Sequence, residues 1–190
     1  MSRWQPNARG RLERAALDLF IERGFDQATV TEIAERAGLT ERTFFRYFTD
    51  KREVLFWGQD HLRELYVSAI AAAPDSAAPI DAVAAALRAA VPIFHERHEI
   101  ARQRQAVIDA NPGLQERELL KRTALAAAMA EALRRRGVSD PAASLAAEIG
   151  AIAFGAAFAR WVHAPGERDL TPLIREALDQ LKAITAGASA

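Results

Sequence analysis

The stretch that decides the fold is Thr31-Glu-Ile-Ala-Glu-Arg-Ala-Gly-Leu-Thr40-Glu-Arg-Thr-Phe-Phe-Arg-Tyr-Phe48, in which two short helical patterns flank a glycine. The small side chain of Ala34 lets the two helices cross closely, and Gly38 supplies the positive φ that a tight turn needs. Thr40 is placed to cap the second helix. The pattern predicts a helix-turn-helix. The apolar residues that would close its small core are Leu19, Phe20, Ile33, Leu39, Phe44 and Phe48.

The remaining face of the second helix carries polar and aromatic side chains. In a helix-turn-helix, the early residues of this recognition helix meet base edges in the major groove of DNA. Arg42 suits a guanine and Glu41 suits the amino group of a cytosine. A plain helical hairpin is the alternative, but it gives no reason for two helices this short with a threonine at each start. The outward-facing residues are Glu41, Arg42, Thr43, Phe45 and Arg46.

Apolar residues recur at helical spacing through the rest of the chain, so the whole chain is predicted to be all-α. A loose arm over residues 1–8 precedes a first helix that ends at Gly24. We expect residues 1–50 to form a DNA-binding domain and residues 51–190 a helical body for ligand binding and dimerisation. Asp50 is placed to cap the helix that links them. The helices expected after the first are 31–37, 40–48, 50–73, 80–96 (with a kink or a false start at Pro92), 99–110, 114–136, 141–163 and 170–185.

The composition excludes several classes of protein. The 190 residues include 25 basic and 25 acidic side chains and no Cys, and half are apolar. A core is therefore expected, whereas disulfides, thiolate nucleophiles and Cys-based metal sites are excluded, and the cytoplasm is the expected compartment. The longest charge-free run, 149–159, falls short of the roughly 20 residues that span a bilayer, so we expect no membrane span. No set of residues typical of catalysis can be recognised, so we expect no enzyme and no cofactor.

Residues 1 to about 55 resemble the DNA-binding head of the TetR family of bacterial one-component regulators. The resemblance implies a homodimer that binds a near-palindromic operator in double-stranded DNA and releases it when a small molecule enters the body. The matching residues are Leu19-Phe20, Gly24-Phe25, Val30-Thr31, Ile33-Ala34, Ala37-Gly38-Leu39-Thr40, Thr43-Phe44, Tyr47-Phe48, Lys51 and Leu55.

Carried over by position, the resemblance implies that Thr31, Tyr47 and Lys51 bind phosphates. It also implies that Glu41, Arg42 and Thr43 read bases. Phe45 stands where the family usually has Tyr, and the missing hydroxyl removes a phosphate hydrogen bond. Residues 1–52 hold ten basic and eight acidic side chains, so one head binds weakly and two are needed, about 34 Å apart on the DNA. The predicted DNA-binding residues are Thr31, Thr40, Glu41, Arg42, Thr43, Phe45, Arg46, Tyr47 and Lys51.

The helix expected at 141–163 is apolar nearly all round, so it needs burial on more than one side. Small residues recur on it at every fourth position, which forms a ridge that another helix can approach closely. With an apolar stripe on the last helix, this favours a four-helix interface between two chains, the alternative being an interior helix of a monomer. The residues predicted for the interface are Ala147, Ala151, Gly155, Ala159 and Leu178, with Ala143 at the start of the ridge.

The body is predicted to enclose an apolar cavity for a small effector. Segment 102–136 also resembles, more weakly, the body of a TetR subgroup associated with acyl-CoA-like ligands. Arg134, Arg135 and Arg136 suit phosphates, although basic residues in the last turn of a helix are explained equally well by its dipole. The predicted pocket residues are Phe94, His98, Arg102, Leu125, Met129, Phe154, Phe158 and Trp161.

His95, His98 and Glu99 form one metal-like cluster. The cluster lacks the His-Glu-x-x-His spacing of zinc peptidases, because Glu99 stands where the second His belongs, so we expect no metal site.

The sequence therefore predicts a DNA-binding transcriptional regulator, a repressor that a small apolar or amphipathic molecule releases from a palindromic operator. Two alternatives stay open. One is an all-α carrier or enzyme with a vestigial helix-turn-helix, and the other is a DNA-binding protein whose filled body senses nothing.

Overall fold

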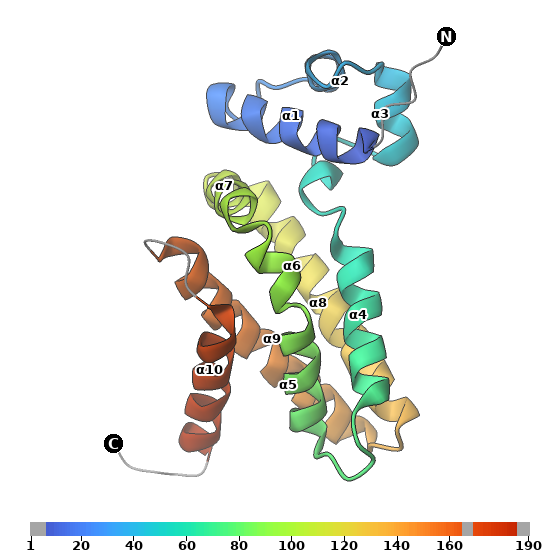
Figure 1. The fold of residues 1–190 in the computed structure, drawn as a ribbon, viewed down its shortest axis with the longest axis vertical. Coiled ribbons are helices and arrows are strands. Elements are labelled where there is room, and N and C mark those ends of the chain that lie inside the picture. The colour runs from blue at the N-terminus through green and yellow to red at the C-terminus, as the bar shows by residue number, and fades with distance from the viewer. Residues whose placement is uncertain (1–6, 165–168, 186–190) are drawn as a thin grey trace. The chain divides into compact units, whose positions relative to one another are not determined.

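The computed structural model describes residues 7–164 and 169–185, and these residues form helices and contain no strand (Figure 1). The all-α prediction is confirmed. The described residues group into two compact units. The first comprises residues 7–57 with 103–118, and the second comprises 58–102, 119–164 and 169–185.

The first unit begins with α1 (Ala8–Arg23), α2 (Val30–Arg36) and α3 (Glu41–Tyr47). The Asn7 side chain caps α1 by accepting the Gly10 N–H at 2.9 Å. Gly24 ends α1 with a φ of 85°, which a glycine adopts without strain. The second helix starts one residue earlier than predicted.

The start of α2 moves because Thr29, not Thr31, caps it. The Thr29 hydroxyl accepts the Glu32 N–H, and the Glu32 carboxylate accepts the Thr29 N–H at 3.0 Å. This reciprocal pair satisfies two amide groups that would otherwise lack partners at the helix start.

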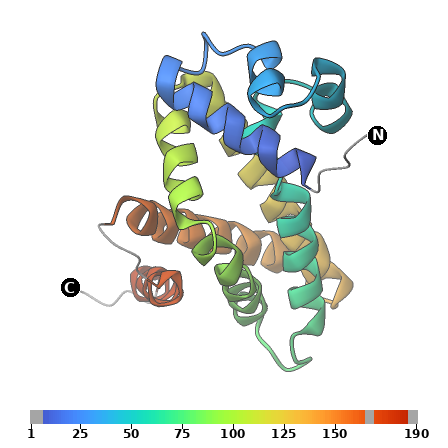
Figure 2. The ribbon, with the colours of Figure 1, turned by 45° about the horizontal axis from the view of Figure 1, so that its top comes forward.

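The helix-turn-helix forms as predicted. Gly38 has a φ of 64°, and beside it the Leu39 N–H donates to the Ala34 carbonyl at 2.8 Å. The Thr40 side chain accepts the Thr43 N–H and so caps α3. Figures 1 and 2 show α2 and α3 following α1 in one compact arrangement. Five of the predicted core residues are buried, and Leu39 is half-buried; the five are Leu19, Phe20, Ile33, Phe44 and Phe48.

The prediction of a single helix over residues 50–73 is wrong. A short 3-10 turn, η1 (Glu53–Leu55), comes first, and α4 (Gln59–Ala72) begins only after Gly58. Asp50 caps the turn instead of a long helix, since it accepts the Arg52 N–H at 2.7 Å. The Leu55 carbonyl accepts a hydrogen bond from the Arg104 side chain at 2.6 Å. That carbonyl would otherwise accept the amide four residues on, so this bond favours the break in the helix.

Residues 103–118 join the first unit through ion pairs and a ring contact. They comprise the end of α7 (His98–Asp109) and the start of α8 (Pro112–Arg135). Arg104 pairs with Glu118 at 2.9 Å, and its guanidinium lies 4.9 Å from the centre of the Phe56 ring. Arg117 donates to the Glu53 carboxylate at 2.8 Å. The unit that contains the helix-turn-helix therefore takes in a second segment of chain.

The second unit holds α4, α5 (Pro79–Ala89), α6 (Val91–His95), α9 (Asp140–His163) and α10 (Leu170–Thr185), with the remaining parts of α7 and α8. The helix predicted at 80–96 is two helices that meet at Ala90, because the ring of Pro92 fits only the first turn of a helix. Helix α5 packs against α4 and α9, and α10 packs along α9.

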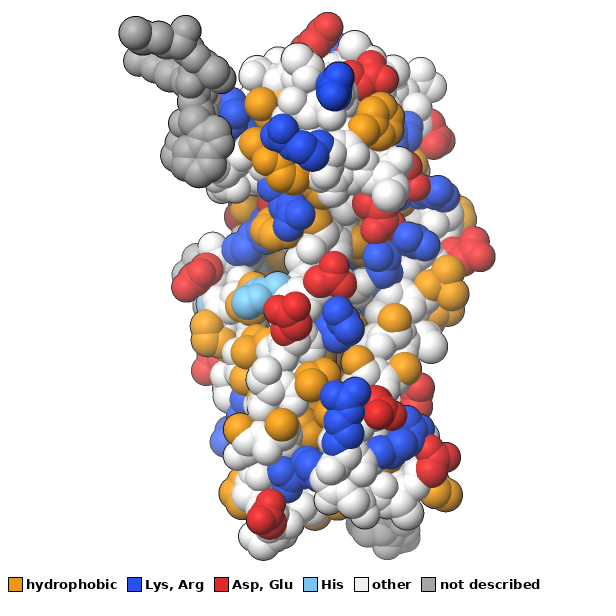
Figure 3. Space-filling model, turned by 90° about the vertical axis from the view of Figure 1, so that its right-hand side faces the viewer, with side chains coloured by type: hydrophobic (Ala, Val, Ile, Leu, Met, Phe, Trp, Pro, Cys, Tyr) orange, Lys and Arg blue, Asp and Glu red, His pale blue; other side chains and the backbone are white. Residues whose placement is uncertain are grey.

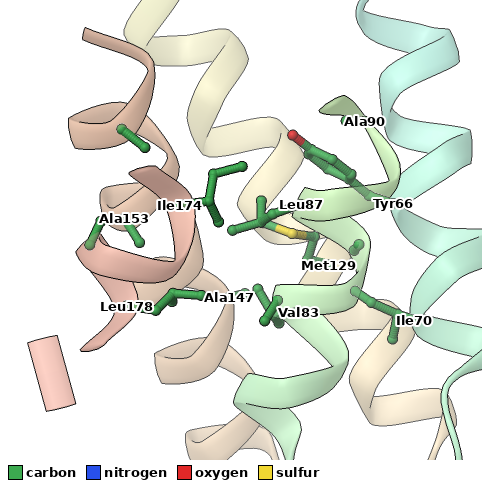
Figure 4. Close-up of a cluster of buried hydrophobic side chains, with 14 of the residues drawn as sticks. Tyr66, Ile70, Val83, Leu87, Ala90, Met129, Ala147, Ala153, Ile174 and Leu178 are labelled. Atoms are coloured by element: carbon green, nitrogen blue, oxygen red, sulfur yellow. The ribbon is translucent and has the colours of Figure 1, made fainter. Parts of the chain in front are cut away.

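Helices α4 to α10 all contribute buried residues to one hydrophobic core, part of which Figure 4 shows. Helix α9 approaches α5 closely at Gly150, where an added Cβ would lie 2.2 Å from the Val83 side chain. The buried residues labelled in Figure 4 include Tyr66, Ile70, Val83, Leu87, Met129, Ala147, Ile174 and Leu178.

Within the described ranges, α9 is the one helix that is long and apolar enough to cross a membrane by length and composition. In this fold, α9 packs along α5 and α10, and Ala153 and Trp161 are among its buried residues. This packing accounts for part of its apolar surface, and the remainder is exposed at Leu145 and Ile152.

Candidate nucleic-acid interface and effector region

The recognition helix α3 presents a mixed polar and aromatic face. Glu41, Arg42 and Arg46 are exposed, and Phe45 is 51% exposed although it is a large apolar residue. Phe44 on the opposite side is fully buried and anchors the helix in the core. The structure thus brings four of the predicted DNA-contacting side chains onto one accessible surface.

Among the arginines of residues 9–52, two groups differ in their ion-pair partners. The first group is neutralised by carboxylates at 2.6–2.9 Å, in the pairs Arg23–Glu32, Arg36–Glu22 and Arg52–Asp50. The second group has no ion-pair partner among the described residues and comprises Arg9, Arg14, Arg42 and Arg46. Two of these four, Arg42 and Arg46, lie on α3, so the recognition helix carries unneutralised positive charge.

Carboxylates in the first group have altered pKa values. The hydrogen bond from Arg36 lowers the pKa of Glu22, and the hydrogen bonds from the Thr29 amide and hydroxyl lower the pKa of Glu32. Burial alone would raise the pKa of Asp50, but its hydrogen bonds to Arg52 and to the Glu53 amide outweigh burial and lower it.

Three threonines predicted to contact DNA are engaged within the protein. The Thr31 hydroxyl donates to Glu41 at 2.9 Å, which links the start of α2 to the start of α3. The hydroxyls of Thr40 and Thr43 lie 3.0 Å apart and share a hydrogen bond. Thr31 therefore fixes the orientation of the Glu41 carboxylate, which still has free lone pairs for a base edge.

Lys51 was predicted to bind a DNA phosphate, but its side chain contacts the backbone of its own chain. Its ammonium donates to the carbonyls of Phe25, Asp26 and Ala28 at 2.8, 3.1 and 3.0 Å, and it lies 4.5 Å from the centre of the Phe25 ring. These bonds use all three ammonium protons. Lys51 also does not stand at a helix start, because α4 begins at Gln59. The arrangement holds the loop after α1 in place, and the phosphate contact stays a prediction.

Two arginine side chains, Arg9 and Arg46, lie close to the ring of Tyr47 at the end of α3. The Arg46 guanidinium lies 5.0 Å from the centre of its ring and donates to its hydroxyl at 3.3 Å. The Arg9 guanidinium lies 5.6 Å from the Tyr47 ring and 5.5 Å from the Trp57 ring. Figure 3 shows Lys and Arg side chains beside hydrophobic ones on the part of the surface that the head forms. Sequence spacing gave no reason to place Trp57 here.

In the second unit, α6 and α9 form an aromatic cluster. The Phe94 ring lies 5.3 Å from Phe154 and 5.5 Å from Phe158, and Phe158 lies 5.6 Å from Trp161. His98 meets the Trp161 ring edge to face at 4.5 Å. The structure therefore brings together five of the eight residues predicted for the pocket.

The His98 Nε2 atom is buried and has no hydrogen-bond partner among the described residues. A buried polar atom in such a setting is costly unless a ligand or water satisfies it. His98 is the polar group of the cluster that is best placed to select a ligand.

The other three predicted pocket residues, Arg102, Leu125 and Met129, have different surroundings. Arg102 is exposed and pairs with Glu99 at 3.1 Å. Met129 is fully buried in the core, and Leu125 packs against that core.

The run of three arginines at the end of α8 is engaged within the protein. Arg134 pairs with Asp140 and Glu131, and Arg135 pairs with Glu131. Arg136 donates to the carbonyls of Ala73 and Pro74 at 2.7 and 2.6 Å, just beyond α4. These contacts favour a structural role for the three arginines over a role in binding phosphate.

Three further residues of the second unit have informative surroundings, and the sequence patterns did not single out two of them, Arg122 and Tyr66. Arg122 lies over Gly155, where an added Cβ would be 2.3 Å from its Nη2 atom, so Gly155 makes room for a cation beside the aromatic residues. His95 accepts the Leu170 N–H at 3.1 Å. Tyr66 is buried in the core, and this burial raises the pKa of its hydroxyl.

The predicted dimer residues fall on different sides of α9 and α10. Ala147 and Leu178 are buried within their own chain, and Gly155 faces Arg122. Ala151 is half-buried and Ala159 is exposed. The exposed apolar surface of α9 is instead formed by Leu145 and Ile152, which are 64% and 56% exposed. The interface itself stays a prediction.

The His95 Nε2 atom lies 3.6 Å from the Asp169 carboxylate, and this pair alone supplies too few ligands for a metal site. Within residues 7–164 and 169–185, no group of three or more His, Asp and Glu side chains is placed to hold a metal ion.

Comparison with known sequences gives two family matches. The family described as bacterial regulatory proteins, tetR family, matches residues 13–56, and the family described as MftR C-terminal domain matches residues 77–186. The transcriptional regulator TcmR of Streptomyces glaucescens is 37% identical over 81 residues, which is 43% of this chain and 36% of TcmR. The uncharacterized regulator YdeS of Bacillus subtilis is 44% identical over 41 residues, 22% of this chain and 21% of YdeS. The matches thus span about a third or less of these relatives.

Solved structures resemble the chain over nearly its full length. Thermus thermophilus FadR, a TetR-family repressor in complex with lauroyl-CoA, is 26% identical with a TM-score of 0.55, covering 96% of this chain and 95% of that chain. Bacillus subtilis FadR in complex with stearoyl-CoA is 19% identical with a TM-score of 0.62, covering 90% and 96%. The second likeness concerns the fold alone.

Proposed function

Because the chain belongs to the TetR family of bacterial regulatory proteins, we propose that it is a ligand-responsive repressor of transcription. Two copies bind a near-palindromic operator through their α3 helices, and a small amphipathic molecule bound in the body releases the DNA. The observation that carries the proposal is the unneutralised charge of Arg42 and Arg46 on the exposed face of α3. Electrostatic attraction to phosphates supplies much of the affinity of such proteins, and base contacts supply the sequence preference.

Each side chain of α3 has a distinct role in this proposal. Arg42 reads a guanine, and Glu41, oriented by Thr31, accepts from a cytosine amino group. Phe45 offers its ring to a thymine methyl group, because it lacks the hydroxyl that would bind a phosphate. Arg46 and Tyr47 stand on the phosphate side of this surface.

The apolar surface of α9 at Leu145 and Ile152 is proposed to hold the two chains together. Exposed apolar side chains on a long helix favour a partner helix from a second copy, as in a four-helix interface. One head carries little net charge, so pairing of two heads is needed for useful affinity.

The effector is proposed to bind at the aromatic cluster of α6 and α9. The rings of Phe94, Phe158 and Trp161 offer apolar contact, and the buried His98 Nε2 atom offers one hydrogen bond. Arg122 stands beside Gly155 and has no ion-pair partner among the described residues, so it can receive an anionic group. These features suit an amphipathic molecule such as a fatty acyl thioester, and the lauroyl-CoA bound to the 26% identical relative supports this class.

Release of DNA is proposed to follow a population shift. The effector favours an arrangement of the body in which the two α3 helices no longer match the operator. Moving such an equilibrium from almost fully bound to almost fully released requires a difference in affinity of about 5.5 kcal/mol.

The proposal is tested by selecting duplexes from a random pool with the purified full chain. We expect enrichment of a near-palindrome, and we expect lauroyl-CoA to reduce its retention. A pool that stays random after repeated rounds would contradict DNA recognition. Retention that is unchanged by lauroyl-CoA, free laurate and aromatic acids would contradict the effector class while leaving DNA recognition intact.

A carrier or enzyme with a vestigial helix-turn-helix is the competing function. It predicts no salt-sensitive binding to any duplex, whereas the regulator predicts affinity that falls steeply as salt rises.

A further inference from the structure

Arg9 contacts two aromatic rings at the edge of the recognition helix. Its guanidinium lies over the ring of Tyr47, the last residue of α3, and over the ring of Trp57, at 5.6 and 5.5 Å from their centres. All three residues belong to the first unit. A planar guanidinium stacks on aromatic faces while its N–H groups remain directed outward at the edge. The two ring contacts thus hold the cation in position and leave its donors available.

A second cation converges on the same tyrosine. Arg46 lies 5.0 Å from the Tyr47 ring centre and donates to the Tyr47 hydroxyl. Two like charges near one ring repel each other, and a nearby anion offsets this repulsion. Neither Arg9 nor Arg46 pairs with a carboxylate among the described residues, in contrast to Arg23, Arg36 and Arg52.

We propose that Arg9 and Arg46, held by Tyr47 and Trp57, form a binding site for one backbone phosphate of DNA that flanks the bases read by α3. The inference rests on the proposed function. It adds a contact from α1, outside the helix-turn-helix, and it gives Trp57 the role of a positioning residue for Arg9. A phosphodiester fits because its oxygens accept the parallel N–H groups of a guanidinium.

The site accounts for the position of these residues better than an internal ion pair does. Arg9 is exposed on the first turn of α1, and that turn contains no acidic residue. The Arg11 guanidinium, two residues on, instead donates to the Ala37 carbonyl at 2.9 Å and so holds the helix-turn-helix together. Adjacent arginines of α1 therefore have different tasks, one internal and one directed toward a ligand.

The test compares the wild-type chain with R9A, R9K and R14A on the duplex selected by the wild type. Arg14 is the matched control, because it is exposed on the same helix and has no ring contact or ion pair among the described residues. We expect R9A to raise the dissociation constant about tenfold or more for every duplex sequence. It should also reduce the slope of log affinity against log salt by about 1.8 for a dimer with two such sites.

R14A should change both quantities much less than R9A. R9K should recover part of the salt slope but little of the affinity, since an ammonium neither stacks nor forks like a guanidinium. Equal losses in R9A and R14A would show a mere effect of net charge and would overturn the site.

A neutral methylphosphonate, placed at each flanking phosphate in turn, distinguishes a DNA phosphate from free phosphate. At one position per half-site, wild type and R9A should bind the modified duplex equally well, because the partner of Arg9 is then uncharged. If R9A remains weaker than wild type at every position, the DNA site is overturned. If the wild type itself binds no duplex, the proposed function has failed rather than this inference.

Discussion

At the scale of single residues, the charge of Arg42 decides sequence preference. Arg42 is exposed near the start of α3 and has no ion-pair partner among the described residues. R42A should relax the preference at one base pair per half-site, by about 1–3 kcal/mol. Competition between duplexes that differ at single positions measures this preference. R23A is the control, because Arg23 is already neutralised by Glu32. A uniform loss over all positions in R42A would show that Arg42 contacts only phosphate.

The hydrogen-bond partners of Lys51 could not be predicted from its position in the sequence. Its three carbonyl acceptors lie 23 to 26 residues earlier in the chain, so only the folded loop brings them to the ammonium. K51A should lower the free energy of unfolding by about 1–3 kcal/mol, because it leaves the three carbonyls without this donor. Urea unfolding measures the effect. R52A, which breaks an exposed ion pair, should cost less than about 1 kcal/mol. Equal stability of K51A and wild type would contradict the structural role.

The lowered pKa of Glu32 predicts how acid affects the head. A carboxyl group whose pKa is lower in the folded than in the unfolded state stabilises the fold above its unfolded pKa. This contribution is lost as the pH falls below the ordinary glutamic acid value of 4.5. E32Q should therefore be less stable than wild type at neutral pH, and the difference in melting temperature should shrink below pH 4.5. A difference that is constant from pH 7 to pH 3 would contradict a role for the charge.

At the scale of elements, the ends of α7 and α8 belong with the helix-turn-helix. The Arg104 guanidinium reaches the Leu55 carbonyl and Glu118, so residues 103–118 are tied to the turn η1. E118Q leaves a half-buried guanidinium with a weaker partner and should destabilise the chain by about 1–3 kcal/mol in urea unfolding. E116Q on the same helix is the control, because Glu116 is exposed. A loss in E116Q as large as that in E118Q would contradict the specific role of the pair.

The elements also show what sequence patterns could predict. Gly38 and Thr40 act through neighbours within five residues, so the turn and the cap of α3 were predictable. The break between η1 and α4 depends on Arg104, which is 49 residues from Leu55, and no local pattern contains that contact. Gly155 was predicted to face a second chain because its spacing matches a ridge of small residues. Within its own chain Gly155 lies beside Arg122, a contact that only the packing of α8 reveals, and its place in an interface stays a prediction.

At the scale of the whole molecule, dimerisation depends on the exposed apolar surface of α9. I152E places a charge at the centre of that surface and should convert a dimer into monomers, because burying an unpaired charge is costly. Sedimentation equilibrium measures the mass. I21E is the control, since Ile21 is 53% exposed on α1. A mass that is unchanged in I152E would place the interface elsewhere.

In the proposed function, two α3 helices of one dimer enter the same DNA. Hydroxyl-radical footprinting on the selected duplex tests it most directly. We predict two protected regions whose centres lie about one helical turn apart, or a small multiple of it, with two chains bound per duplex. A single protected region, or one chain per duplex at saturation, would contradict the claim.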